Sequence, residues 1–345
     1  MKDEVKKYYS EVLQKSSDLQ TNACCSIDDV DPELKKSINK IHSEIIEKFY
    51  GCGSPIPSVV EGKTILDLGC GSGRDVYILS SLVGENGFVI GVDMTDEQLE
   101  VAKKHQDFQR EKFSYKKSNV EFKKGYIEDL KSLNIEDNSI DIIISNCVIN
   151  LSPDKKAVFK EIYRVLKPGG ELFFSDIYTN RRIPKDLQED PELYGECLSG
   201  AMYKEDFRRL MFEVGFCDVR LLNSGTVTID NAIIEEKLSN YKFTSETLRA
   251  FKIQELEDRC EDYGQVAYYR GGIKNSDCFY HLDDHHIFEL NRPMLVCSNT
   301  ARMLKDTRLS PYFEIIGDES QHFGLFDCSS SDEGSSNLKE DSSCC

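Results

Sequence analysis

Along residues 63–178, short apolar runs alternate with longer stretches that mix hydrophobic and polar positions. Short apolar runs predict strands over residues 64–68, 87–93, 120–124, 140–146 and 171–177. Between them, longer stretches predict helices over residues 74–82, from Thr95 onward, and over residues 153–166. Thr95 and Gln98 have the spacing of a capping box, and residues 167–170 predict a turn into the last strand. Repeated strand–helix units of this kind are typical of an α/β fold, in which helices cover both faces of a parallel sheet.

The segments that flank this core have different patterns. Residues 1–62 are polar and predict helices over residues 5–19 and 31–49. Residues 179–203 indicate an insertion, followed by a helix over residues 204–214 and by strands near residues 219–222, 226–229 and 241–252. Residues 253–317 carry aromatic residues and prolines, and residues 318–345 are acidic and rich in serine. The last segment has too few large apolar residues to offset the entropy of ordering, so we expect it to be disordered.

The composition narrows the class of function. Acidic residues outnumber basic ones by 61 to 43, which gives a net charge of −18. Without a basic stripe such a chain repels nucleic acid, so a nucleic-acid substrate is not expected. No run approaches the ~18 consecutive apolar residues of a membrane span, and no secretory signal follows Met1. The sequence therefore predicts a cytoplasmic protein that does not bind membranes, and a monomer, because no exposed apolar repeat is evident.

The chain has 13 cysteines and no Cys-x-x-Cys motif. A reducing cytoplasm keeps most of them as thiols, for which the open uses are core filling, metal binding and redox chemistry. We interpret five of them as structural: Cys70, Cys217, Cys260, Cys278 and Cys297. The Cys344-Cys345 pair has two open interpretations, arsenic capture and an inert tail, of which the inert tail is favoured. A cluster of histidines and acids is interpreted as a solvated loop rather than a metal site: His281, Asp283, Asp284, His285 and His286.

A glycine-rich loop with an acid in front of it follows the first predicted strand. Asp67 precedes Gly69, Gly71 and Gly73, and such glycines let the backbone turn sharply and let a ligand approach closely. A nicotinamide dehydrogenase is disfavoured, because its G-x-G-x-x-G loop needs glycine where this chain has Arg74. The Asp67 carboxylate would also repel a pyrophosphate. Asp93, at the end of the next strand, can accept hydrogen bonds from both hydroxyls of a ribose, so the loop indicates S-adenosylmethionine.

These residues resemble class I S-adenosylmethionine-dependent methyltransferases and, more narrowly, the arsenite methyltransferase family. The resemblance is carried by Tyr8-Tyr9 and by residues 18–24, 50–53, 65–75, 91–95, 145–151 and 195–201. It implies a Rossmann-like sheet with helices on both faces. Together with the patterns above, it divides the chain into five parts: an N-terminal helical segment (1–62), a cofactor-binding core (63–178), an arsenic-binding insertion that completes the sheet (179–252), a small C-terminal domain (253–317) and a disordered tail (318–345).

The resemblance also implies site residues. The cofactor would contact Asp67, Gly69, Gly71, Ser72, Gly73, Asp93, Met94, Ile127, Glu128 and Asn146. Trivalent arsenic would be bound by Cys52, Cys147 and Cys197. Cys24 would form a disulfide with Cys52 during turnover, with the neighbouring Cys25 as the alternative. Thioredoxin or glutathione would then reduce that disulfide.

The expected reaction transfers methyl groups from S-adenosylmethionine to arsenite, giving methylated arsenicals. Thiolates are soft ligands that suit a soft centre, and three of them leave the arsenic lone pair available for attack. Two alternatives remain open at this stage. The chain could methylate a small organic or thiol acceptor, or it could bind metalloids without catalysis.

Overall fold

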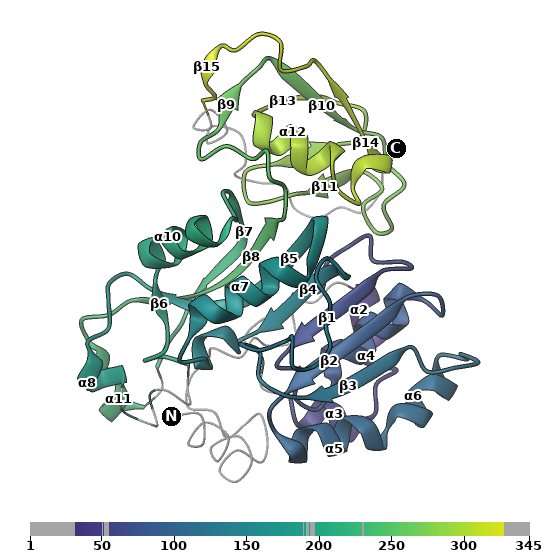
Figure 1. Cartoon of the computed structure of the whole chain (residues 1–345), viewed down its shortest axis with the longest axis vertical. Coiled ribbons are helices and arrows are strands. Elements are labelled where there is room, and N and C mark those ends of the chain that lie inside the picture. The colour runs from purple at the N-terminus through teal and green to yellow at the C-terminus, as the bar shows by residue number, and fades with distance from the viewer. Residues whose placement is uncertain are drawn as a thin grey trace.

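The computed structural model describes residues 32–49, 51, 55–188, 190, 193, 197–229 and 231–327. The expected helix over residues 5–19 lies outside these residues, as do Cys24, Cys25, Tyr50, Cys52, Cys344 and Cys345. Within the described part, a large α/β sheet is joined at one end to a smaller region rich in β-strands (Figure 1). No helix in that part is both long enough and apolar enough to cross a membrane.

The central sheet has the strand order β3-β2-β1-β4-β5-β8-β7. Its strands are β1 (Thr64–Leu68), β2 (Phe88–Asp93), β3 (Val120–Lys124), β4 (Ile140–Asn146), β5 (Leu166–Thr179), β6 (Met202–Tyr203), β7 (Val219–Thr226) and β8 (Phe243–Phe251). Strands β1 to β5 are parallel, whereas β8 and β7 continue the sheet in antiparallel pairs. The short β6 pairs with the end of β5. The predicted parallel α/β sheet is therefore confirmed.

Alternate side chains of each parallel strand fill the core on opposite faces of the sheet. Leu66 and Ile143 face the layer that contains α7 (Lys155–Val165) and α10 (Lys204–Val214). Ile65 and Ile142 face the other layer. That layer contains α2 (Pro32–Ile38), α3 (Ser43–Glu47), α4 (Arg74–Val83) and α5 (Asp96–Lys104), and α6 (Gln106–Lys112) follows α5. Burial on both faces explains why these strands are almost continuously apolar.

Two helix predictions need correction, and a further helix was missed. The single helix expected over residues 31–49 is two helices, α2 and α3, and His42 caps the second by accepting a hydrogen bond from the Glu44 amide. Thr95 precedes α5, but its side chain makes no capping bond. Its amide instead donates to Asp93 Oδ1 at 2.8 Å, so the capping-box interpretation was wrong. Helix α11 (Ala232–Leu238) was not predicted at all.

Two strand predictions also need correction. Residues 167–170 are not a turn before the strand but an irregular part of β5, since the pairing with β4 shifts between Leu166 and Glu171. The strand expected over residues 226–229 is absent from the described chain, where β7 instead extends to Thr226 and ends. In the first place the backbone stays paired with its neighbouring strands despite the glycines, and in the second the pairing of β7 with β8 ends at Thr226.

Residues 253–327 form the smaller β-rich region. Its elements are β9 (Glu261–Asp262), β10 (Gln265–Tyr269), β11 (Phe279–His281), β12 (Ile287–Glu289), β13 (Pro293–Val296), α12 (Ser298–Lys305), β14 (Phe313–Ile316) and β15 (Gly324–Leu325). A sheet of order β13-β10-β14 and helix α12 enclose a separate apolar cluster around Tyr269 and Phe288. The expectation of disorder from residue 318 was wrong as far as residue 327, because β15 pairs with β9 and Glu319 forms an ion pair with Arg302.

Candidate active site

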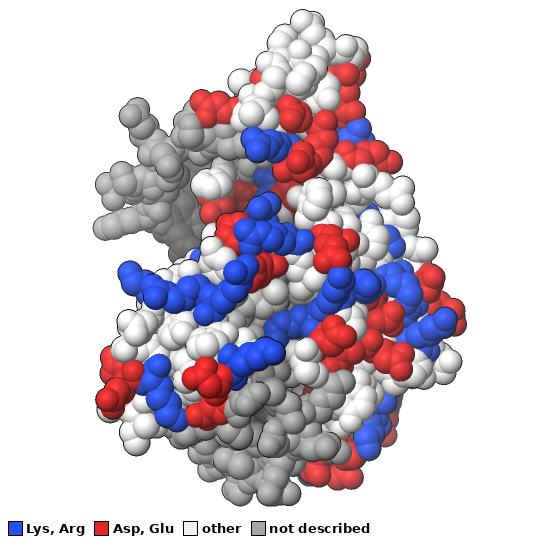
Figure 2. Space-filling model, turned by 60° about the vertical axis from the view of Figure 1, so that its left-hand side comes forward, with Lys and Arg blue, Asp and Glu red and all other residues white. Residues whose placement is uncertain are grey.

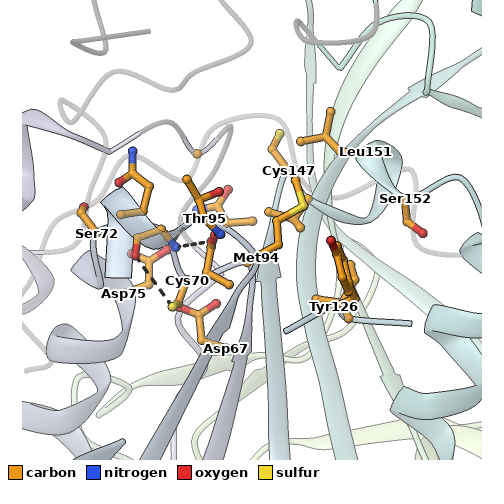
Figure 3. A pocket seen from close by; sticks show the side chains of 18 of the residues that line it. Asp67, Cys70, Ser72, Asp75, Met94, Thr95, Tyr126, Cys147, Leu151 and Ser152 are labelled. Atoms are coloured by element: carbon orange, nitrogen blue, oxygen red, sulfur yellow. Dashed lines mark hydrogen bonds between the residues drawn. The ribbon is translucent and has the colours of Figure 1, made fainter. Parts of the chain in front are cut away.

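A pocket opens at the carboxyl ends of the parallel strands, where ligands bind in open α/β sheets (Figure 3). It is bordered by the loops after β1, β2, β3 and β4 and by the end of the segment that follows α3. Nine of the ten predicted cofactor residues line it: Asp67, Gly69, Gly71, Ser72, Asp93, Met94, Ile127, Glu128 and Asn146. Lys48, Phe49 and Gly51 also line it and were not predicted.

The glycines of the loop have different roles. Gly69 and Gly71 line the pocket with φ values of 74° and 50°, a conformation that favours glycine. A Cβ on Gly69 would lie 2.3 Å from a methyl carbon of Val148. Gly73 does not line this pocket. A Cβ on Gly73 would instead point at the side chains of Phe122 and Ala102. Gly73 therefore lets α4 approach its neighbours closely rather than leaving space for a ligand.

Buried carboxylates dominate the electrostatics of the pocket. Burial, together with the charges of Asp75 and Asp93, raises the pKa of Asp67 well above its ordinary value, and only Arg74 opposes this. Burial also raises the pKa of Asp93, although the amides of Gly71 and Thr95 each donate to its carboxylate at 2.8 Å. Clustered acids of this kind favour a cationic ligand, which would relieve their mutual repulsion.

Two buried acceptors in the pocket lack a hydrogen-bond donor within the described residues. They are Gln98 Oε1 and Asp75 Oδ1, the second of which still forms an ion pair with Arg74 Nε at 3.4 Å. A buried acceptor without a hydrogen bond is costly, so Gln98 Oε1 above all points to a ligand that carries N–H or O–H groups. The ammonium and ribose hydroxyls of S-adenosylmethionine supply such donors, and the residues present therefore fit that cofactor.

Ser72 holds the chain segment that covers the pocket. Its hydroxyl donates to the Ile45 carbonyl at 2.9 Å and also reaches the Lys48 carbonyl at 3.3 Å. Next to it, the Arg74 guanidinium lies 3.6 Å from the centre of the Phe49 ring. These contacts bind the segment after α3 to the start of α4, so the glycine loop and the N-terminal segment form one wall.

On the opposite wall, Glu128 is tied to the loop after β4. The Ser152 hydroxyl donates to Glu128 Oε1 at 2.7 Å, and both residues line the pocket. Ile127 beside Glu128 is buried. Both predicted residues therefore border the pocket, and Ser152 is an addition that the sequence did not single out.

Two predicted arsenic ligands lie side by side. Cys147 follows β4 and projects into the pocket, as Figure 3 shows. The Cys197 thiol donates to the Cys147 carbonyl at 3.5 Å, although 50 positions separate them in sequence. Both cysteines are buried and both have positive φ, 57° and 60°. Positive φ is uncommon outside glycine and clusters at functional sites. Cys147 is disulfide-bonded in this structure, whereas Cys197 is a reduced thiol.

A buried polar network behind Cys197 was missed from the sequence. Burial lowers the pKa of Lys155 to about 8, and the nearby charges of Asp176 and Cys197 partly oppose this shift. Burial raises the pKa of Asp176 to about 6. Asn150 donates from its side chain to Asp176 at 2.6 Å. Lys155, Asp176 and Asn150 belong to different elements at the edge of the sheet, so no short sequence motif predicts this network.

One further group within the described chain has metal-ligand spacing. His42, Glu44 and His105 bring their ligand atoms within 4.8 Å of one another. Lys104 Nζ and His105 Nε2 each lie 2.7 Å from the same Glu44 oxygen. Because the lysine already neutralises that carboxylate, we assign the group a structural role that ties α3 to α5.

Comparison with known proteins bears directly on this geometry. A methyltransferase-domain family model matches residues 60–215. The chain is 51% identical to an arsenite methyltransferase of Aquipseudomonas alcaligenes, over 95% of this chain and 94% of that protein. It is 43% identical to the arsenite methyltransferase of Mus musculus, over 90% and 82%. The crystal structure of an arsenic(III) S-adenosylmethionine methyltransferase from Chlamydomonas reinhardtii matches with a TM-score of 0.84 at 50% identity, covering 86% of this chain and all of that one.

Proposed function

Because this chain belongs to the arsenite methyltransferase family and has the class I methyltransferase fold, we propose that it methylates trivalent arsenic held by the thiolates of Cys52, Cys147 and Cys197. The observation that carries the proposal is the contact between Cys147 and Cys197 beside a pocket of buried carboxylates. Cys52 lies outside the described residues, and its place in the ligand set rests on the family resemblance.

S-adenosylmethionine is the methyl donor of this family, and when bound it supplies an electrophilic methyl group. Its ammonium group would be held by Asp67 and Asp75, and its ribose by Asp93. Ile127 and Glu128 would border the adenine. Gly69, Gly71 and Met94 would shape the loop around the cofactor. Asn146, at the end of β4, donates to Asp75 at 3.1 Å and would fix this carboxylate in the first turn of α4. We keep Ser72 and Gly73 in the set as supports of that wall.

The thiolates would hold arsenic as substrate with its lone pair directed toward the pocket. Soft sulfur ligands suit a soft, polarisable centre. No proton sits on the attacking arsenic, so the chain needs no strong general base and acts by positioning. A well-oriented arrangement can remove as much as about 7–11 kcal/mol of barrier.

Methylation formally oxidises arsenic by two electrons, which must be returned before another methyl group is added. We propose that Cys52 and Cys24, or Cys25 in its place, supply them and become a disulfide that thioredoxin or glutathione reduces. The disulfide-bonded Cys147 of this structure would likewise have to be reduced before it could bind arsenic. A thiol reductant is therefore part of the proposal.

The proposal includes a cytoplasmic monomer that acts on small molecules and binds neither nucleic acid nor membranes. The net charge of −18 supports the exclusion of nucleic acid. Figure 2 shows basic side chains interspersed with acidic ones on the face drawn. Several basic side chains of α10 are already paired, Arg208 with Glu205 and Arg209 with Asp206. We also propose a division of the chain after residues 62, 178 and 252, with residues 253–327 as its C-terminal part.

The test is arsenic speciation after incubating protein, S-adenosylmethionine, thiols and arsenite. We expect methylated arsenicals from the wild type and from Cys217→Ser, a cysteine to which the sequence assigns no part in arsenic binding. We expect none from Cys147→Ser or Cys197→Ser, because each removes one of the two neighbouring thiols. Absence of methylarsenicals from a wild type that still binds the cofactor would refute the proposal. Unchanged turnover in both cysteine variants would favour another acceptor. Arsenite binding without release of S-adenosylhomocysteine would indicate a non-catalytic protein.

A further inference from the structure

A second pair of cysteines lies in the β-rich region, toward the end of the central sheet opposite the pocket. Cys297 directly precedes α12, and Cys260 directly precedes β9. Arg220 of β7 donates to the Cys297 sulfur and pairs in register with Arg249 of β8. That register position lies away from the end of β8 that pairs with Thr179, where the pocket opens. The sequence interpretation treated both cysteines as structural.

The Cys297 sulfur is surrounded by hydrogen-bond donors. It caps α12 by accepting from the Thr300 amide at 3.4 Å, lies 3.3 Å from the Thr300 hydroxyl, and accepts from Arg220 Nη2 at 3.8 Å. The Cys260 side chain also hydrogen-bonds to it. Cys297 is fully buried, Cys260 is partly exposed, and both are reduced. These donors, Cys260 first, lower the pKa of Cys297 to about 5 against the opposing effect of burial.

The charged groups around the sulfur are held in place. Arg220 forms ion pairs with Asp218 at 2.6 Å and with Asp283 at 3.1 Å. Asp283 also lies 2.8 Å from His286 Nδ1, and the Glu257 carboxylate accepts from the Ser298 hydroxyl at 2.5 Å. Asp283 and His286 are buried, so the solvated-loop interpretation of residues 281–286 was wrong for these two. The arrangement leaves Cys297 facing a fixed cation with its neighbouring acids already partnered.

We propose that Cys260 and Cys297 are a redox-active dithiol that closes to an intramolecular disulfide by exchange with a small-molecule disulfide such as oxidised glutathione. The geometry assigns the order of the steps. The partly exposed Cys260 meets the reagent first, forms a mixed disulfide and releases one reduced glutathione. The buried Cys297 thiolate then attacks the Cys260 sulfur, forming the Cys260–Cys297 bond and releasing the second glutathione. The dithiol loses two electrons and two protons, which the small disulfide gains.

Cys217 provides the matched comparison within the same part of the molecule. It is also partly exposed and reduced. Burial and the charges of Asp218 and Asp258 raise its pKa, so it lacks the stabilised thiolate that Cys297 has. Partial exposure of a thiol beside acidic residues is therefore not enough for the proposed exchange, which also needs the hydrogen bonds that lower the pKa of Cys297.

The experiment equilibrates the full-length chain in glutathione buffers from reducing to oxidising, quenches with acid and maps the cysteine peptides by mass spectrometry. We expect a Cys260–Cys297 linked peptide that grows with oxidised glutathione and disappears with excess reduced glutathione. Cys217→Ser should leave it unchanged. In Cys297→Ser, Cys260 should accumulate glutathione several-fold above wild type, because the resolving thiolate is gone. In Cys260→Ser, Cys297 should stay reduced.

Thr300→Val removes one hydrogen-bond partner of the Cys297 sulfur and leaves both cysteines in place. Loss of the hydroxyl should slow closure several-fold at about pH 6 and less at about pH 8, where the thiolate forms anyway. The proposal is overturned if no linked peptide forms at any buffer ratio while Cys260 carries as much glutathione in wild type as in Cys297→Ser. Should Cys297→Ser fail to fold, the state of Cys297 in Cys260→Ser gives the same decision. These peptides report on the pair whether or not arsenic is methylated.

Discussion

Asp176 carries a burial cost that should be visible as pH-dependent stability. Its carboxyl is buried at the end of β5 and accepts from the amides of Asn150 and Ile177, yet burial still raises its pKa from 3.8 to about 6. The fold therefore favours the neutral acid. That stabilising contribution is complete below about pH 4 and is lost as the pH rises through about 6, a difference of about 3 kcal/mol.

Asp176→Asn should remove this pH dependence while keeping an acceptor for Asn150. We expect the stability of the variant relative to wild type to rise by up to about 3 kcal/mol between about pH 4 and about pH 7. Urea unfolding across that range measures it. Asp206→Asn is the control. Hydrogen bonds from Arg182 lower the pKa of Asp206, so the stability of this variant relative to wild type should not rise with pH in the same way. Identical pH profiles for wild type and Asp176→Asn would contradict the assignment.

Gly69 is the loop position where both backbone and space require glycine. Its φ is 74°, and a Cβ would lie 2.3 Å from Val148. Gly62→Ala separates the two effects, since Gly62 has φ 70° but no described atom within 4 Å of its Cβ position. We expect Gly62→Ala to cost about 1 kcal/mol of stability. Gly69→Ala should cost more and weaken S-adenosylhomocysteine binding more than tenfold in calorimetry.

A Gly69→Ala/Val148→Ala double variant should recover part of the lost affinity, because it removes the methyl groups that a new Cβ would meet. No recovery would show that backbone strain alone sets the requirement for glycine at position 69.

For single residues, the sequence was informative where the chemistry is local: Asp67 and Asp93 flank a glycine loop that one short stretch of chain builds. It was silent about Lys155 and Asp176, because their neighbours come from distant strands and loops.

Among the elements, α3 and the residues after it depend on Ser72 for their position over the pocket. The buried Ser72, in the loop before α4, donates from its hydroxyl to the Ile45 carbonyl. Ser72→Ala should therefore loosen residues 43–49 and weaken cofactor binding indirectly, with a stability loss of about 1 kcal/mol. Amide hydrogen exchange of these residues and calorimetric titration measure the two effects.

Ser81→Ala is the matched control for this prediction. Its hydroxyl donates to the Ile78 carbonyl within the same helix, so its loss leaves the pocket wall intact. If Ser72→Ala weakens cofactor binding while exchange in residues 43–49 stays at the wild-type level, Ser72 contacts the cofactor itself. The indirect role proposed here would then be wrong.

Element boundaries were predictable where the local pattern and the packing agree. The expected strand over residues 64–68 and helix over residues 204–214 coincide with β1 and α10. The strand after residue 166 was misjudged because two glycines indicate a turn, whereas pairing with β4 and β8 keeps the chain in the sheet. Helix α11 was missed because only Ile234 and Leu238 of its short length are buried. Its apolar pattern spans too few turns to be distinctive.

For the molecule as a whole, one buried carboxylate connects three parts of the chain. Glu171 of β5 is fully buried and forms ion pairs with Arg249 of β8 and with Arg308, which follows α12. Arg308 also donates to the carbonyls of Ser58 and Val59 in the segment before β1. The β-rich region, the sheet and the N-terminal segment are therefore joined through a single charge cluster that apolar residues enclose.

Arg308→Ala should destabilise the chain by about 3–5 kcal/mol, because it leaves a buried carboxylate with one cation in place of two. Arg292→Ala, which breaks an exposed ion pair with Glu289, should cost no more than about 1 kcal/mol. Chemical denaturation measures both. Adding Glu171→Gln to Arg308→Ala should destabilise the chain further, because the buried Arg249 then loses the carboxylate that pairs with it. If the double variant is at least as stable as Arg308→Ala alone, the Glu171 charge does not stabilise the junction through Arg249, which would contradict the assignment.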